Sequence, residues 1–242
     1  MAPWREPGQT GRDTSDMGGN LGYKLDFGVV FAYWPELAWG CAGTLGLAIA
    51  GMVIAIVIGV GGVVLRHSRL MVIRWLVIGF VEVIRNTPFL VQIYFIFFAL
   101  PLIGIRLAPT PTAIIALGVN GGAYAIEIIR GGVEAIGRGQ AEAGLALGLH
   151  RRQVFRYIVL KPALRAIYPS LTSQFILLTL TTSIAAAVSA YELTSVAQEI
   201  ESNTFRSFEV YGTVTVLYLV MSMLLMRCFS AIGARAFSYP VK

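Results

Sequence analysis

Charged residues are scarce in this chain. Asp, Glu, Lys and Arg make up 13% of its 242 residues, whereas hydrophobic residues make up 56%. The mean hydropathy of +0.71 is too high for a soluble globular domain of this size. A bilayer core about 30 Å thick needs roughly 20 apolar residues per helical span, and several such windows are present. The composition predicts an integral membrane protein built as one membrane domain.

Cysteine and histidine are also rare, with two of each. Cys41 and Cys228 lie in apolar segments near opposite ends of the chain, which is typical of packing residues rather than of metal ligands. His67 and His150 each stand beside an arginine in polar linkers. With so little material, we expect no metal site, no cofactor and no histidine-based catalytic centre.

Lysine occurs only at Lys24, Lys161 and Lys242, and none of the three follows a glycine. A phosphate-binding loop requires Gly-Lys followed by Ser or Thr, so no ATP site of that kind is present. Energy from ATP would have to come from another subunit. The pI near 9.5 would suggest nucleic acid in a soluble protein. Here the basic residues stand beside apolar segments, so membrane topology explains them and we expect no nucleic acid partner.

The apolar runs predict an all-α integral membrane fold with about five transmembrane helices. The expected spans are Leu37 to Leu65, Phe89 to Ile103, Thr112 to Ile129, Ile167 to Ala190 and Val210 to Ile232. Residues 70–86 are apolar but interrupted, and the sequence leaves open whether they are interfacial or belong to a span. Small residues at Ala42, Gly46 and Ala50 predict a close helix approach along the first span.

Lys and Arg are unevenly distributed over the two sides of this five-span arrangement, with fourteen on one side and five on the other. Positively charged loops stay in the cytoplasm. The N-terminal segment 1–35 is therefore expected outside. The transmembrane domain 36–237 follows with its cytoplasmic linker 131–165, and the tail 238–242 is expected in the cytoplasm. No apolar run of signal-peptide length precedes the first span, so that span is expected to direct insertion.

Within the linker, residues 139–153 predict two short helices that are broken at Gly148. Ala and Leu favour helix before that position, and a glycine there can adopt the left-handed conformation of a helix C-cap. The segment resembles the cytoplasmic motif of type I importer permeases of the ATP-binding cassette (ABC) superfamily, polar amino acid branch: Glu-Ala-Ala, three residues, Gly, nine residues, Ile-x-Leu-Pro. The matching residues are Glu142, Ala143, Gly144, Gly148, Ile158 and Leu160. Gly144 replaces the second Ala, and Pro162 stands one place late, after Lys161.

Other stretches are similar to the same branch. Residues 85–92, Arg-Asn-Thr-Pro-Phe-Leu-Val-Gln, resemble its Arg-Gly-Thr-Pro-Leu-Leu-Val-Gln, and residues 123–133 resemble its third-span signature. Thr182-Ser183 and residues 191–194, Tyr-Glu-Leu-Thr, are similar to the region after the linker. The resemblance covers roughly residues 26 to 237.

The resemblance implies a type I ABC importer permease of the histidine, glutamine or arginine type in a bacterial inner membrane. Its linker would be a coupling helix that docks into a cytoplasmic ATP-binding subunit. Ala143, Gly144 and Leu145 would fit a groove, Glu142 would meet a basic group, and Gly148 would end the helix. The other implied partners are a second permease subunit, identical or homologous, and an extracytoplasmic substrate-binding protein. The alternative is an ordinary solvated loop in which Glu142 is a surface charge.

Polar side chains inside the spans are candidates for the substrate pathway, because ionisable groups are costly at membrane depth. They are Asn120, Tyr124 and Glu127 on one face of the third span, and Thr179, Thr182 and Ser183 on the fourth. Glu127 could equally pair with Arg130, one helical turn away. Each hydroxyl could simply bond its own helix, which we favour over solute contact for any single one.

Two other functions compete with an ATP-driven importer. An ion-coupled carrier or channel needs a self-sufficient pathway and usually internal repeats, which are not visible in the sequence. A membrane enzyme needs an acid-base or metal constellation, and Glu127 has no His or Cys nearby in the sequence to form one.

Overall fold

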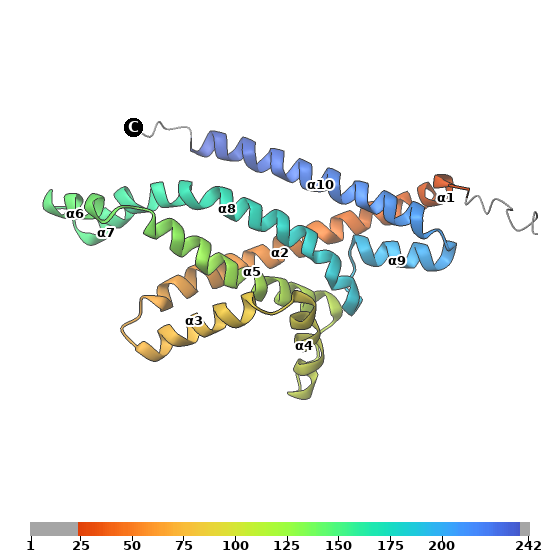
Figure 1. Cartoon of the computed structure of the whole chain (residues 1–242), viewed down its shortest axis with the longest axis horizontal. Helices are drawn as coiled ribbons and strands as arrows, with labels where there is room; N and C mark the ends of the chain where they lie inside the picture. Colours follow the sequence, from red (N-terminus) through yellow and green to blue (C-terminus); the bar gives the residue numbers. More distant parts are fainter. Residues whose placement is uncertain (1–23, 238–242) are drawn as a thin grey trace, which may run out of the picture.

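The computed structural model describes residues 24–237, so the predicted tail 238–242 and most of the predicted segment 1–35 lie outside the described residues. The described chain is helical throughout (Figure 1). Its elements are α1 (Phe27–Phe31), α2 (Trp34–Arg66), α3 (Met71–Arg85), α4 (Phe89–Leu102), α5 (Pro109–Glu134), α6 (Arg138–Ala146), α7 (Arg151–Gln153), a π-helical turn (Val154–Val159), α8 (Leu160–Thr181), a 3-10 turn (Thr182–Val188), α9 (Leu193–Thr204) and α10 (Ser207–Ala236).

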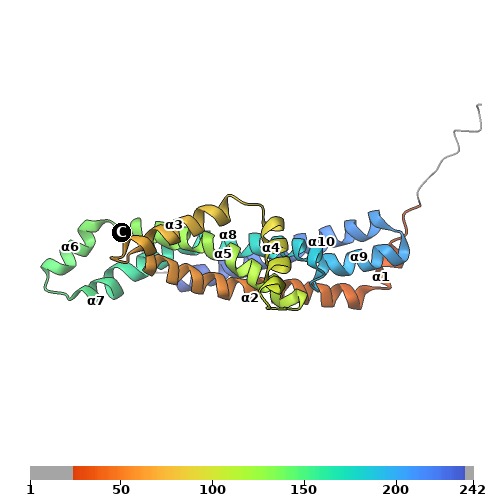
Figure 2. The same ribbon diagram turned by 90° about the horizontal axis from the view of Figure 1, so that it is seen from below.

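Four helical stretches are long and apolar enough to cross a membrane: α2, α5, residues 151–188 and α10. A fifth forms if α3 and α4, which meet at a bend of 111°, count as one broken span. The prediction of about five spans is therefore confirmed. Helix α3 packs on α2 and α5 (Figure 2). Residues 71–85 thus pass the test for a membrane segment together with α4, as a bent pair.

The closest packing in the bundle joins α2 to α5, and glycines make it possible. A Cβ atom added to Gly59 would lie 2.7 Å from Cβ of Ala125, and one added to Gly118 would lie 2.5 Å from Cγ2 of Ile54. Contacts this short require each helix to place a glycine where a side chain of the other helix approaches. The small residues predicted to allow a close helix approach lie outside this contact, because Ala42 and Gly46 are exposed on the single chain and a Cβ at Gly46 would touch nothing.

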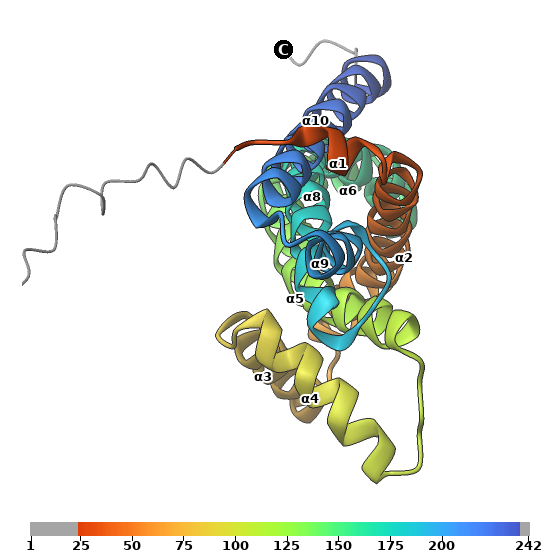
Figure 3. The ribbon, with the colours of Figure 1, turned by 90° about the vertical axis from the view of Figure 1, so that its right-hand side faces the viewer.

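The bundle is elongated, and its two ends differ. The linker helices α6 and α7 project at one end, and α9 lies with α1 at the other (Figures 1 and 2). Viewed along the long axis, α3 and α4 stand apart from α10, on the opposite side of the bundle (Figure 3). The end with α6 and α7 is the linker end, and the end with α9 and α1 is the α9 end.

Candidate functional site

The linker forms the helix break that the sequence predicts. Gly148 has a φ of +82°, the left-handed conformation, directly after α6. The N–H of Leu149 donates to the carbonyl of Gly144 at 3.1 Å, and the N–H of Gly148 donates to that of Leu145 at 3.0 Å. This pair of bonds is the Schellman motif, which satisfies the last carbonyls of a helix. The end of α6 is therefore fixed by its own backbone.

Most side chains of α6 point away from the chain. Glu142 and Ala143 are exposed, Leu145 is 44% exposed and Leu147, just after the helix, is 83% exposed. Gly144 is the exception among the predicted docking residues. It is buried, and a Cβ there would lie 2.4 Å from Cδ1 of Ile158. Gly144 thus lets α6 pack on the following helix, and the surface for another protein is formed by its neighbours.

The chain after the linker contains a π-helical turn, Val154–Val159, that leads into α8. A π turn takes one more residue than an α turn. Pro162 stands one residue later than the motif predicts, and a proline ring inside a helix crowds the carbonyl four residues earlier. A widened turn accommodates both the extra residue and the ring, so the late proline leaves α7 and α8 in continuous helical connection.

The polar face of α5 binds the break between α3 and α4. The Asn120 side-chain amide donates to Oε1 of Gln92 at 3.0 Å. Nε2 of Gln92 donates in turn to the carbonyls of Ile84 at 2.7 Å and Thr87 at 3.0 Å. Gln92 therefore satisfies backbone groups left open by the break and fastens it to α5. Sequence reasoning missed this residue, although it ends the motif at residues 85–92.

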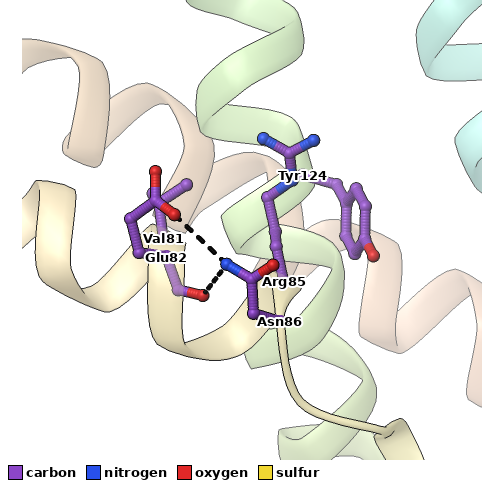
Figure 4. A pocket seen from close by; sticks show the side chains of 5 residues that line it. All are labelled: Val81, Glu82, Arg85, Asn86 and Tyr124. Atoms are coloured by element: carbon purple, nitrogen blue, oxygen red, sulfur yellow. Dashed lines mark hydrogen bonds between the residues drawn. The ribbon is translucent and has the colours of Figure 1, made fainter.

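Tyr124 lies one turn further along α5 and faces a polar cavity (Figure 4). The guanidinium of Arg85 stands over its ring, with its central carbon 5.3 Å from the ring centroid. Val81, Glu82 and Asn86 complete the lining of this cavity of about 290 Å³. Sequence reasoning singled out Tyr124 and quoted Arg85 and Asn86 only within the motif at residues 85–92, so it did not bring them together, and it missed Glu82.

Glu127 forms ion pairs with two arginines. One carboxylate oxygen pairs with Arg66 of α2, and the other accepts from Arg130 at 2.7 Å. Arg130 also pairs with Glu134 near the end of α5. The local pair with Arg130 is the alternative that the sequence offered, and Arg66 adds a link to α2. This network joins the linker-end termini of two spans.

The hydroxyls on the fourth span bond their own helix. Thr179 donates to the carbonyl of Phe175 at 2.9 Å, Thr182 to that of Thr179 at 2.7 Å and Ser183 to that of Leu180 at 2.8 Å. Thr179 and Thr182 are fully buried, and Ser183 is half-buried. Of the three, Ser183 is the one with surface available to a solute.

A polar cluster that sequence reasoning did not find closes the α9 end. We call Thr44, Glu192, Thr194, Ser195 and Tyr218 the α9 cluster. The buried Glu192 carboxylate accepts the N–H groups of Thr194 at 2.8 Å and Ser195 at 2.7 Å, and the Tyr218 hydroxyl at 2.7 Å. Thr44 of α2 accepts the N–H of Leu193 at 3.2 Å. Burial raises the pKa of Glu192, although these hydrogen bonds lower it in part.

Within residues 24–237, no group of three or more His, Cys, Asp or Glu side chains could hold a metal ion. The molecule instead combines apolar spans, a broken span with polar groups at the break, and a rigid exposed helix between spans. That combination is typical of the membrane subunit of a transporter.

Comparison with known proteins identifies the family. Residues 51–238 match the model of the binding-protein-dependent transport system inner membrane component, and the chain belongs to this family. The glutamine transport system permease protein GlnP of Escherichia coli K12 is 37% identical over 212 residues, which cover 84% of this chain and 93% of that protein. The L-cystine transport system permease protein TcyB of Bacillus subtilis is 34% identical over 213 residues, covering 87% and 91% respectively.

Among solved structures, a chain of the crystal structure of an amino acid ABC transporter with histidines superimposes with a TM-score of 0.82. It is 31% identical, and the match covers 88% of this chain and 99% of that one. The predicted resemblance to polar amino acid importer permeases and the predicted fold are thus confirmed. The chain is a multi-pass inner membrane permease subunit of an ABC importer, and ATP hydrolysis belongs to a separate subunit. A binding protein and an ATPase follow, in general, from the family.

Proposed function

We propose that this permease imports a polar amino acid of the glutamine type, which a binding protein delivers from the outer side. A cytoplasmic ATP-binding subunit docks at α6, and a second permease subunit, identical or homologous, completes the pathway. The relatives named for glutamine and cystine support the substrate class. A bundle with about five spans in one chain has few helices to enclose a solute path, which supports a pair of subunits around a shared axis.

The observation that carries the docking proposal is the form of the linker. Helix α6 is short, ends in a rigid Schellman motif and exposes Glu142, Leu145 and Leu147 at the tip of the molecule. A rigid helix moves as a unit when a bound partner moves, so the movement reaches the spans and is not absorbed by a flexible loop. The exposed leucines supply apolar contact, and Glu142 fixes the register against a basic group. Ala143 lies between them, while Gly144 and Gly148 shape the helix.

The substrate pathway is proposed to run along the polar face of α5. Asn120 and Tyr124 line it, together with Ser183 across the bundle. Thr179 and Thr182, predicted for the same face, are fully buried and bond their own helix. Glu127 lies on the same face nearer to the linker, and it would meet the ammonium group of a passing amino acid. Support comes from the broken span beside Asn120, because discontinuous helices with polar groups at the break are a common form of binding site in transporters.

Orientation is proposed from the charge distribution: the linker and the C-terminus in the cytoplasm, the N-terminus outside. The test uses a permease in which Cys41 and Cys228 are replaced by alanine and a single cysteine is placed at Gln153 or Ser202. An impermeant thiol reagent applied to intact cells, with the outer membrane permeabilised, is expected to label the cysteine at position 202 and spare that at 153. The opposite pattern would invert the topology.

Docking is tested by isolating the complex. A tagged permease co-expressed with its candidate ATPase subunit is expected to retain that subunit through affinity purification, and Leu147→Asp is expected to release it. Gly137→Asp is the control, because it adds the same charge at an exposed position in the turn before α6. Equal retention of the ATPase by all three proteins would place the docking surface elsewhere.

A further inference from the structure

An apolar cleft runs between α2 and α8 in the half of the bundle next to the linker end. Its volume is about 580 Å³, and α5 contributes Ile129 and Val133 to its lining. Ala163 in its wall is buried, whereas Val60 and Val64 on α2 are at least half exposed. The cleft therefore opens on the outside of the bundle. None of the side chains that line it belongs to the proposed substrate pathway.

The cleft has the length of one lipid leaflet. Its lining extends from Ile56 to His67 on α2 and from Leu160 to Leu171 on α8. Each of these stretches is about 16 Å long at 1.5 Å per residue, and half of a hydrocarbon core about 30 Å thick is about 15 Å. His67 follows the last residue of α2, at the linker end. The cleft therefore extends from the membrane surface to about the middle of the hydrocarbon layer.

The side chains that line the cleft suit an acyl chain better than a helix of another protein. Transmembrane helices pack closely where small residues let their backbones approach, as Gly59 and Gly118 do between α2 and α5. In the cleft, Ala163 is the one small residue among Val, Ile, Leu, Phe and His side chains. A helix with its side chains is about 10 Å wide, whereas an acyl chain is narrow and bends to follow such walls.

The linker end of the cleft is basic. Arg156 of the π-helical turn and Lys161 of α8 each directly follow a residue that lines the cleft, and both are exposed. His67 lines the cleft itself at this end. The acidic residues on the same stretch of α5, Glu127 and Glu134, are already paired with arginines. The surplus charge is therefore positive, at the level where lipid phosphates lie.

We propose that the cleft binds an anionic glycerophospholipid, with one acyl chain along the cleft and the phosphate at its linker end. Arg156 presents a planar fork of donors to the phosphate oxygens. The His67 ring stands at the same end, where its Nδ1 donates to the Val63 carbonyl at 2.9 Å. A zwitterionic lipid fits the same walls but gains less from the basic groups, because its own cation offsets the phosphate. The site is independent of which solute the transporter carries, and the orientation proposed above places it in the cytoplasmic leaflet.

The test uses the detergent-purified complex of the permease with its ATPase, freed of bound lipid. The complex is titrated with phosphatidylglycerol or with phosphatidylethanolamine of identical acyl chains, and native mass spectrometry counts the lipids that each complex retains. One phosphatidylglycerol per permease chain is expected to bind about ten-fold more tightly than phosphatidylethanolamine. Equal affinity for the two lipids would overturn the proposal, because the basic end of the cleft would then select nothing.

Variants that fill the cleft locate the site. Val60→Trp places an indole ring in the cleft from an exposed position and is expected to weaken the binding of phosphatidylglycerol about ten-fold or more. Val57→Trp adds the same ring at an exposed position of α2 outside the cleft and is expected to bind as the wild type does. If Val60→Trp fails to assemble, Leu164→Trp fills the cleft from α8, with the exposed Leu177→Trp as its control. Equal binding by a filling variant and its control would place the lipid elsewhere and overturn the proposal.

A change of charge separates the head group from the acyl chain. Arg156→Gln is expected to weaken the binding of phosphatidylglycerol about five-fold and to leave that of phosphatidylethanolamine unchanged. Arg74→Gln, at an exposed position in the first turn of α3, removes the same charge outside the cleft and is expected to change neither affinity. An equal loss in the two variants would mean that the charge of the whole linker end attracts the lipid, and the proposed site would be wrong. If Val60→Trp instead separates two permease chains in the mass spectrum, the cleft is an interface between copies and does not bind lipid.

Discussion

Two carboxylates, one toward each end of the bundle, are stabilised in different ways. Glu192 at the α9 end is fully buried and accepts hydrogen bonds from two backbone N–H groups and a tyrosine, without a cation. Glu127 toward the linker end keeps 21% of its side chain exposed and pairs with two arginines. A network of neutral donors must keep its geometry to be satisfied, whereas ion pairs tolerate displacement. The comparison suggests a rigid α9 end and an adjustable linker end.

The surroundings of the two carboxylates agree with this contrast. Glu192 also begins α9 as its N-cap, and the cluster around it ties α2, α9 and α10 together. Near the linker end, α6 buries only Gly144 among the residues whose exposure is described, and the network of Glu127 joins two helices by charge. A partner that binds and releases α6 therefore acts on the end of the molecule that has less buried contact and can move more easily.

The largest expected effect comes from breaking the α9 cluster. Glu192→Ala leaves the backbone N–H groups of Thr194 and Ser195 without an acceptor, while the Tyr218 hydroxyl keeps the Thr194 hydroxyl as a partner. Each unsatisfied group costs about 1–3 kcal/mol, so we expect a loss of about 2 kcal/mol or more in the free energy of unfolding. The measurement is the midpoint of thermal unfolding in detergent, followed by tryptophan fluorescence. Glu199→Ala, an exposed position on the same helix, is the control. Equal midpoints for the two variants would show that the cluster is not a rigid element.

The contrast also separates what the sequence could predict from what it could not. Gly148 was predicted correctly because a C-cap depends on backbone conformation within one turn. The pair of Glu127 with Arg130 was foreseen for the same reason, since three residues separate them. Arg66 is 61 residues from Glu127, and Gln92 is 28 from Asn120. Those contacts depend on how helices pack, which periodicity does not determine.

The α9 cluster shows the same limit more strongly, because Thr44 and Leu193 are 149 residues apart. The small residues of α2 give a further example. Ala42, Gly46 and Ala50 have the spacing of a packing stripe, yet the glycines that contact α5 include Gly51, Gly59 and Gly62. Spacing alone cannot tell which of several stripes meets a neighbouring helix. Family motifs located the linker and the broken span, but the polar cavity beside Tyr124 required three-dimensional structure.

At the linker end, a change at the exposed surface is expected to affect coupling and not stability. Glu142→Lys reverses a charge that has no packing role in the chain, so the unfolding midpoint is expected to stay within about a degree of the wild type. Uptake is expected to fall about ten-fold or more, with ATPase activity no longer stimulated by substrate. Gln140→Lys, an exposed position on the same helix, adds positive charge without removing the carboxylate and is the control. Wild-type uptake by Glu142→Lys would refute the coupling role.

A smaller effect is expected where the two arginines hold Glu127. Glu127→Gln removes both ion pairs of a partly exposed carboxylate, and we expect a loss of about 1 kcal/mol or less in stability. Arg66→Gln is the informative comparison, because it breaks one pair and keeps the carboxylate. If Glu127 is structural, the two variants lower uptake to a similar, modest degree. If it meets the ammonium of the substrate, Glu127→Gln alone lowers the uptake of cationic and zwitterionic amino acids. Unchanged uptake in the double variant Glu127→Gln, Asn120→Ala would move the pathway away from α5.

The smallest expected effect is a pH dependence confined to the α9 end. Burial raises the pKa of Glu192 in the folded protein above its unfolded value of about 4.3. The folded state therefore binds this proton more tightly than the unfolded state. The stability that Glu192 contributes is complete below the unfolded pKa and is lost as the pH rises through the folded pKa. Glu192→Gln has no such proton, so the unfolding midpoint of the wild type minus that of the variant is expected to fall from acid to neutral pH. The control is Glu199→Gln. The unfolding midpoint of the wild type minus that of Glu199→Gln is expected to stay constant over the same pH range, because Glu199 is exposed. If the midpoint of the wild type minus that of Glu192→Gln instead grows toward neutral pH, the hydrogen bonds to the Glu192 carboxylate outweigh its burial. The α9 cluster would then stabilise a charged carboxylate, as the ion pairs of Glu127 do at the linker end.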